Sequence, residues 1–139
     1  MKSKSLLLTS PKWATTNNKI SDRVYDYLVD FSKNADIVKS SRHAAAIVYR
    51  NQIVAAGVNK RKSHPIMQRY QSNEERIFLH AEADALIRFM GMYGVDLLPD
   101  CSLYVLRTTK TGRVAGSKPC EGCMAMIDAL NVGQVYWTD

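Results

Sequence analysis

The chain has few cysteines and no long apolar run. Only three cysteines occur among 139 residues, and an odd number of thiols argues against a disulfide framework. No stretch approaches the roughly 18 apolar residues that a membrane span requires. The leucines at positions 6–8 are too few for the apolar core of a secretory signal. We therefore expect a cytoplasmic protein with reduced thiols and no membrane contact.

Acidic residues are also scarce. The chain has thirteen Asp and Glu residues and nineteen Lys and Arg residues, which gives a net charge of +6 and a pI near 9.3. This balance favours anionic partners such as nucleotides or nucleic acid, although it also serves solubility alone. The length is that of about one domain. The hydrophobic fraction of 46% is close to the globular average and predicts a packed core.

The chain shows no internal repeat and no low-complexity segment. Residues 1–18 are polar and predict an arm, in which Trp13 either anchors onto the body or contacts a ligand. Residues 19–139 then form one domain, whose first helix we expect to begin at Ser21 as N-cap and to end near Asn34. Residues 59–78 form a long polar connection without an apolar period, which is usually functional or mobile.

The remaining patterns predict an α/β fold. Apolar runs at 44–49 and 53–58 predict a hairpin turning at 51–52, and 102–107 and 134–137 predict further strands. Residues 80–93 and 120–130 predict helices, with a basic loop at 108–118 between strand and helix. This order gives a mixed sheet of about four strands with helices on its faces.

Three side chains with metal-binding chemistry stand at predicted helix starts. Cys120 and Cys123 are three residues apart, so both sulfurs point toward one place. His80 opens the other helix, and successive helix N-termini in crossover folds lie at the same end of the sheet. Three ligands leave a fourth position for water, which is the arrangement of catalytic rather than structural zinc.

Glu82 follows His80 by two residues and therefore does not share its helix face. From the first turn its carboxylate can still reach a water molecule at the metal. There it can take a proton and return it during the reaction.

Other interpretations of these residues explain less. A redox C-x-x-C pair gives no role to His80 or Glu82. A zinc ribbon needs a second ligand pair, and the sequence offers only Cys101, which we interpret as a small buried apolar residue. The combination of H-x-E with P-C-x-x-C is instead the signature of zinc-dependent nucleobase deaminases.

At these motifs the chain resembles the cytidine deaminase-like superfamily. The segments LHAEADAL at 79–86 and KPCEGC at 118–123 are similar to those of small phage-type deoxycytidylate (dCMP) deaminases, and the resemblance covers residues 44–137. It implies a three-layer α-β-α sandwich, one zinc ion and hydrolytic loss of ammonia. It also implies that His80, Cys120 and Cys123 bind the zinc and that Glu82 is the catalytic proton shuttle.

The resemblance further implies substrate contacts. The Ala81 backbone N–H matches a group that contacts the pyrimidine carbonyl, and Ser117 and Lys118 match a segment facing the leaving amine. Asn59 matches a sugar contact, although it is also a common turn residue. Asp84 stands where dCMP deaminases often carry Asn, and it either contacts substrate or pairs locally.

The sequence is compatible with three hypotheses for the substrate class. A nucleotide such as dCMP needs basic groups for its phosphate, and one predicted wall offers Lys60, Arg61, Lys62 and Arg69. The other wall offers Arg107, Lys110, Arg113 and Lys118, and all these charges could simply be solvated. A nucleoside or free base (cytidine, guanine, adenine) would not need them, and tRNA or single-stranded DNA would also need stacking aromatics. A non-enzymatic, zinc-containing nucleotide-binding module would have no use for Glu82.

The predicted last strand, 134–137, is apolar and β-prone, and the chain stops soon after it. Many relatives continue with another helix and strand, so we expect this domain to be short at its C-terminus. An exposed edge of that kind invites pairing. We therefore expect a homo-oligomer, unless the N-terminal arm covers the edge.

Overall fold

The structure is a computed structural model that describes residues 19–71 and 78–138. The arm expected at 1–18, with Trp13, lies outside the described residues, and so does Asp139. Within the described part of the chain, no helix is long and apolar enough to cross a membrane.

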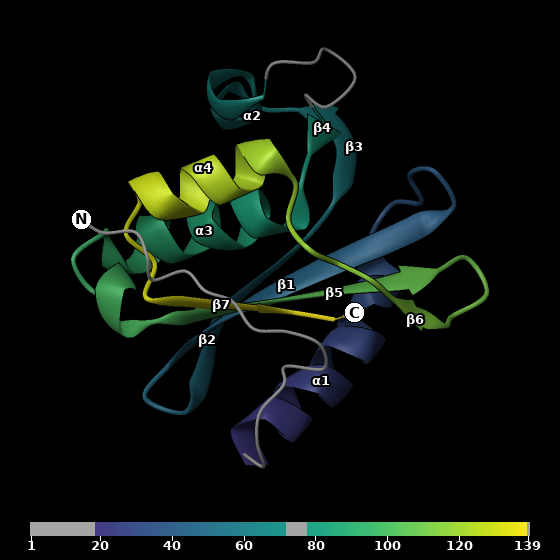
Figure 1. The fold of residues 1–139 in the computed structure, drawn as a ribbon, viewed down its shortest axis with the longest axis horizontal. Helices are drawn as coiled ribbons and strands as arrows, with labels where there is room; N and C mark the ends of the chain where they lie inside the picture. Colours follow the sequence, from purple (N-terminus) through teal and green to yellow (C-terminus); the bar gives the residue numbers. More distant parts are fainter. Residues whose placement is uncertain (1–18, 72–77, 139) are drawn as a thin grey trace.

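A mixed sheet forms the middle layer (Figure 1). Strand β1 (Ser41–Tyr49) lies between β2 (Gln52–Val58) and β5 (Ser102–Thr109) and is antiparallel to both. On its other side β5 pairs with the antiparallel β6 (Val114–Ala115) and the parallel β7 (Gln134–Trp137). The predicted mixed α/β sheet is confirmed, with five strands where about four were expected. The added strand is β6, which forms because the basic loop folds back on β5 through Gly112, at φ 93°.

Helices cover both faces of this sheet, which gives the expected three layers. Helix α1 (Lys19–Phe31) lies on one face, whereas α3 (Ala81–Tyr93) and α4 (Glu121–Ala129) lie on the other (Figure 1). Short 3-10 turns, η2 (Ser32–Asn34) and η4 (Leu98–Asp100), follow α1 and precede β5. Ser21 is not the N-cap of α1, because the helix begins two residues earlier and Ser21 already lies inside it. The helical segment does end at Asn34 as predicted.

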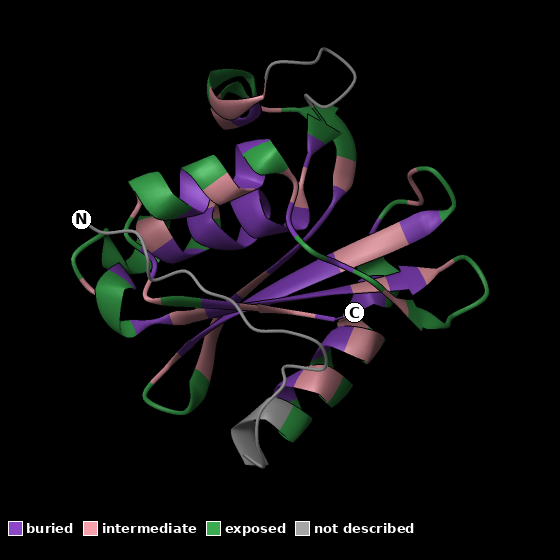
Figure 2. Cartoon of the chain, viewed as in Figure 1, coloured by how far each residue is buried: buried purple, intermediate pink, exposed green. Residues whose placement is uncertain are grey.

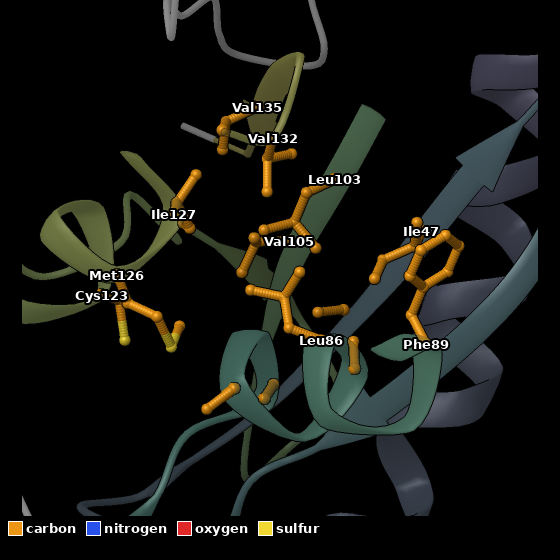
Figure 3. Close-up of a cluster of buried hydrophobic side chains, with 14 of the residues drawn as sticks. Ile47, Leu86, Phe89, Leu103, Val105, Cys123, Met126, Ile127, Val132 and Val135 are labelled. Atoms are coloured by element: carbon orange, nitrogen blue, oxygen red, sulfur yellow. The ribbon is translucent and has the colours of Figure 1, made fainter. Parts of the chain in front are cut away.

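Strand β1 is buried on both sides because it is central. Ala44 and Ala46 face the α1 side, where they join a cluster with Leu28. Ala45 and Ile47 face the other side and pack in the larger cluster with α3 and α4. Figure 2 shows the buried faces of α3 and α4 turned toward the sheet, and Figure 3 shows the larger cluster.

The predicted hairpin is present, with its turn one residue earlier than expected. Arg50 and Asn51 occupy the turn, and both have positive φ angles, of 52° and 63°. Two consecutive residues of this kind make the tight turn whose twist matches that of the flanking strands.

The polar connection at 59–78, for which no helix or strand was predicted, has regular structure. It contains β3 (Lys60–Ser63), the short helix α2 (Pro65–Tyr70) and β4 (Phe78–Leu79), and β3 pairs with β4. Pro65 occupies the first turn of α2, and His64 caps it by accepting from the Ile66 N–H at 3.1 Å. A single deeply buried residue, Met67, seats this helix. Ile66 and Tyr70 also pack against the core, but six residues are too few to give a clear periodic signal, which explains why no helix was predicted. Glu74, Glu75 and Arg76 lie outside the described residues.

Gly57 lets β2 approach α3 closely. A Cβ atom at this position would lie 2.7 Å from the Asp84 Cβ and would also overlap the Ala85 backbone nitrogen. Both opposing groups belong to a helix that is itself packed against the sheet. The absence of a side chain at residue 57 therefore sets how close the first turns of α3 come to the sheet.

We predict opposite effects for two glycine substitutions. Gly57→Ala should lower the free energy of unfolding by about 1–3 kcal/mol, because overpacking forces strand and helix apart. Gly91→Ala should raise it by about 0.5–1 kcal/mol, because the site is helical and a Cβ there would have no neighbour within 4 Å. Denaturant unfolding of both variants measures the difference, and equal effects would contradict the close approach.

Candidate metal centre and active site

The three predicted metal ligands lie at two helix N-termini. Helix α3 begins at Ala81 and α4 at Glu121, so His80 and Cys120 are the residues just before the helices rather than their first residues. Both have extended backbones, with ψ of 156° and 169°. Cys123 follows in the first turn of α4 and belongs to the buried core, beside Met126 and Ile127 (Figure 3).

The ligand atoms of these residues form one cluster. The His80 Nδ1 atom lies 3.1 Å from the Cys123 Sγ atom and 3.8 Å from the Cys120 Sγ atom. All three ligand atoms lie within 4.8 Å of one another. Tetrahedral zinc, with bonds of about 2.3 Å to sulfur and 2.0–2.1 Å to nitrogen, places its ligands roughly 3.5–3.8 Å apart. The donor set and its spacing thus fit a zinc ion.

The cluster is also electrostatically prepared for a cation. The pKa of Cys120 is lowered to about 3, chiefly because its sulfur accepts a hydrogen bond from the Cys123 thiol, with further help from His80 and Gln71. The pKa of Cys123 is raised, because its proton is held by Cys120 and because the residue is buried. One thiolate is therefore available at neutral pH, and a metal would displace the second proton.

Glu82 lies in the first turn of α3 and is only 4% exposed. Burial raises the pKa of its carboxyl group, and the nearby His80 partly opposes that shift. A carboxyl group that binds a proton more readily than usual can both accept and donate one near neutral pH.

A cavity of about 370 Å³ connects these groups. His80, Ala81, Glu82 and Cys120 line it together. Its size lies within the range of roughly 300–1,000 Å³ that is usual for small-molecule sites. Two of the three cluster residues, His80 and Cys120, therefore border the same cavity as Glu82, and a small substrate can enter it.

Residues 19–138 match the family described as the cytidine and deoxycytidylate deaminase zinc-binding region. The chain belongs to this family.

Solved structures with a similar fold include two deaminases. Cytidine deaminase from Mycobacterium tuberculosis is 16% identical, with a TM-score of 0.50 over 81% of this chain and 82% of that one. The dCMP deaminase from cyanophage S-TIM5 is 21% identical, with a TM-score of 0.50 over 82% of each chain. At these identities the likeness shows the fold. No curated protein sequence matches the chain significantly.

The deaminase fold places Asn59 in the cavity wall, at the end of β2. Its Oδ1 atom accepts from the His43 N–H at 2.6 Å, and its Nδ2 atom donates to the Asp36 carbonyl oxygen at 3.0 Å. The amide thus joins β1 to the segment before it. A sugar contact by Asn59 would have to use the remaining hydrogen-bonding capacity of the same amide.

Ser117 makes structural hydrogen bonds, whereas Lys118 lies in the cavity wall. The Ser117 hydroxyl is buried, donates to the Val105 carbonyl oxygen at 2.7 Å and accepts from the Thr138 N–H at 2.8 Å. It therefore ties the segment before α4 to β5 and to the residue after β7. Lys118 lines the cavity, and its Nζ atom lies 5.8 Å from the ring centre of Trp137.

The basic wall differs from the one expected. Of Lys60, Arg61, Lys62 and Arg69, only Lys60 lines the cavity. Arg61 turns away and donates from Nε to the Ile37 carbonyl oxygen at 3.0 Å. The reason is that β3 leaves the cavity after its first residue.

Lys39 and Arg107 supply the missing positive charge, together with Lys118. Arg107 is held in place, because it donates from Nε to the Gly116 carbonyl oxygen at 2.6 Å and from Nη1 to the Ser41 hydroxyl at 2.9 Å. Lys39 was not singled out from the sequence. The sequence feature that could have indicated Lys39 is its position just before β1. This strand pairs with β5, which carries Arg107, and His43 of β1 lies opposite Arg107.

His43 also faces the cavity and was not expected there. Its pKa is lowered to about 4 by burial, by the positive charge of Arg107 and by His80. The imidazole is therefore neutral at pH 7, and the positive charge of the cavity comes from lysine and arginine.

Asp84 does not line the cavity. Its buried carboxylate accepts from the Val58 N–H at 3.0 Å and forms ion pairs with Lys60 at 3.6 Å and Arg88 at 3.2 Å. This geometry favours local pairing over substrate contact. Asp84 joins the end of β2 to the start of α3, which is the part of the helix that carries Glu82.

We predict that Asp84→Ala lowers the free energy of unfolding by about 1–3 kcal/mol, because the buried Val58 N–H loses its acceptor. Asp84→Asn should cost less, since an amide oxygen can still accept that hydrogen bond. Denaturant unfolding compares the two variants. A substrate contact would instead show as lost turnover in an Asp84→Ala protein of unchanged stability.

Proposed function

We propose that this protein is a zinc-dependent hydrolase that deaminates a cytosine-type nucleotide, converting dCMP to dUMP with release of ammonia. The observation that carries the proposal is the convergence of a His-Cys-Cys cluster, a buried glutamate and several cationic side chains on one cavity. Membership of the deaminase family supports the reaction class.

His80, Cys120 and Cys123 would hold the zinc ion, which, when bound, supplies the Lewis acidity that brings the pKa of water toward neutrality. Glu82 takes a proton from the attacking water. It delivers this proton to the ring nitrogen, then takes the remaining proton of the added hydroxyl group and delivers it to the departing amino group, so that water and cytosine become uracil and ammonia. The Ala81 backbone N–H, at the start of α3, donates to the pyrimidine carbonyl oxygen.

The charge of the cavity favours a phosphate-bearing substrate. Lys39, Lys60, Lys118 and Arg107 line it, whereas Glu82 is the carboxylate among the residues that line it. An uncharged nucleoside or base would gain nothing from these cations. A polynucleotide would need a row of stacking aromatics, and within the described residues Phe78 is the aromatic residue of the wall.

We also propose self-association and a cytoplasmic location. Within the described residues β7 pairs with β5 along one edge, and no strand pairs with its other edge. A second copy of the chain, or else the segment 1–18, could cover that edge. Two of the three cysteines belong to the metal cluster and the third is free, which suits a reducing compartment.

We predict that Glu82→Gln binds one zinc ion per chain, as the unmodified protein does, yet loses turnover by about 10²-fold or more, because the amide cannot transfer the proton. Ammonia release from a panel of nucleotides, nucleosides and bases measures turnover, and metal analysis measures zinc. Cys120→Ala is the contrasting variant, which should lose zinc and stability together. Retained activity in Glu82→Gln would show that another group moves the proton.

A second prediction concerns the phosphate. The double variant Lys39→Gln/Lys118→Gln should raise KM for dCMP by roughly tenfold or more, given 1.5–3 kcal/mol for a charged hydrogen bond, and leave KM for deoxycytidine nearly unchanged. Lys62→Gln/Lys110→Gln is the matched control, since it removes the same charge from exposed positions outside the cavity. Equal changes for nucleotide and nucleoside would contradict phosphate recognition.

A further inference from the structure

Gln71 brings a side-chain amide to the sulfur atoms of the metal cluster. Its Nε2 atom lies 3.4 Å from the Cys120 Sγ atom and 3.8 Å from the Cys123 Sγ atom, both within hydrogen-bonding range for sulfur. Gln71 is the residue after α2, and its own backbone N–H donates to the Met67 carbonyl oxygen at 2.9 Å. The side chain is thus held at both ends, by α2 and by the cluster.

Helix α2, which precedes Gln71, is anchored in the protein core. Met67 is 1% exposed and packs in the same core cluster as Cys123. The helix lies against α4, which carries the cysteines (Figure 1). The segment between β2 and α3 therefore reaches back to the metal cluster.

Gly122 makes room for the amide. A Cβ atom at this position would lie 2.5 Å from the Cδ atom of Gln71, which is far inside van der Waals contact. Gly122 is the residue between the two cysteines that faces Gln71. With any larger residue there, the amide could not stay where it is over both sulfurs.

The chemistry of the cluster fixes what this amide does. A thiolate that binds a metal has no proton to donate, so it can only accept. The Oε1 atom of Gln71 lies 3.8 Å from the Cys120 Sγ atom, but a metal-bound thiolate has no proton to give it, so the NH₂ group, with two protons, is the part of the amide that can hydrogen-bond to the sulfurs. Hydrogen bonds of this kind orient metal ligands and tune their electron density.

We propose that Gln71 is a positioning residue that donates from Nε2 to the two metal-binding thiolates, and that residue 122 is glycine in order to admit it. The inference rests on the zinc site of the proposed function and concerns how firmly that zinc is held.

The experiment compares Gln71→Leu and Gln71→Glu with the unmodified protein. Both changes remove the donor, and the second adds a negative charge beside the thiolates. Zinc affinity, measured by competition with a chelator at fixed pH, should fall about 10–100-fold, and further for Gln71→Glu than for Gln71→Leu. Gln68→Leu and Gln68→Glu, at an exposed position of α2, are the matched controls and should bind zinc normally.

Cobalt(II) substitution gives a second readout that does not depend on activity. The sulfur-to-cobalt charge-transfer band should shift in the Gln71 variants, because the sulfur electrons are no longer stabilised by a donor, and should stay in place in the Gln68 variants. A change that only loosened α2 would lower stability without moving the band.

Gly122→Ala tests the same contact from the other side. It leaves Gln71 in the chain but displaces its amide, so it should reproduce the loss of zinc affinity and the band shift. Combining it with Gln71→Leu should add little, because both changes remove one interaction.

Unchanged zinc affinity and an unmoved cobalt band in folded Gln71 variants would overturn the inference and leave the zinc site intact. Additive effects in the double variant would overturn the assigned role of Gly122. If the unmodified protein bound no zinc, the proposed function would fail as well, so the two failures are distinguishable.

Discussion

The direction of the strands is the constraint on which the site depends. Both β2 and β5 are antiparallel to β1, so they run parallel to each other. Helix α3 follows β2, through the segment at 59–79, and α4 follows β5. Because both helices return over the same face, their N-termini meet at the same end of the sheet. That meeting brings His80 to Cys120 and Cys123, although some 40 residues separate them in sequence.

Close packing of α3 against the sheet then determines the environment of Glu82. Gly57 admits α3 to the sheet, and the buried Asp84 fastens the helix to the end of β2. The first turn of α3 is thereby removed from water, and Glu82 with it, which is why the pKa of that carboxyl group is raised. The close contact that Gly57 permits and the raised pKa of Glu82 therefore both follow from the packing of α3 against the sheet.

The sequence patterns predicted the parts of this arrangement that are local or repeated. The motifs at 80–82 and 119–123, the alternating strands and the helices between them led to the fold class, which is confirmed. They did not predict the direction of long side chains. Arg61 and Lys39 are both close in sequence to residues that line the cavity. Arg61 does not line it and donates to the Ile37 carbonyl oxygen instead, whereas Lys39 lines it. Nor could periodicity find α2, a helix of six residues whose position depends on the buried Met67.

Cationic side chains and the buried carboxyl group of Glu82 line the same cavity. A cation beside Glu82 would stabilise its carboxylate and weaken it as a proton carrier. A cation beside the thiolates would compete with the metal. The Gly116 carbonyl oxygen and the Ser41 hydroxyl fix the Arg107 guanidinium, and Arg107 is not among the groups that shift the pKa of Glu82 or of Cys120. His43, which also lines the cavity, is neutral at pH 7 because its pKa is lowered to about 4. Under the proposed function, the wall would thus provide positive charge for an anionic substrate, while Arg107 does not shift the pKa of Glu82.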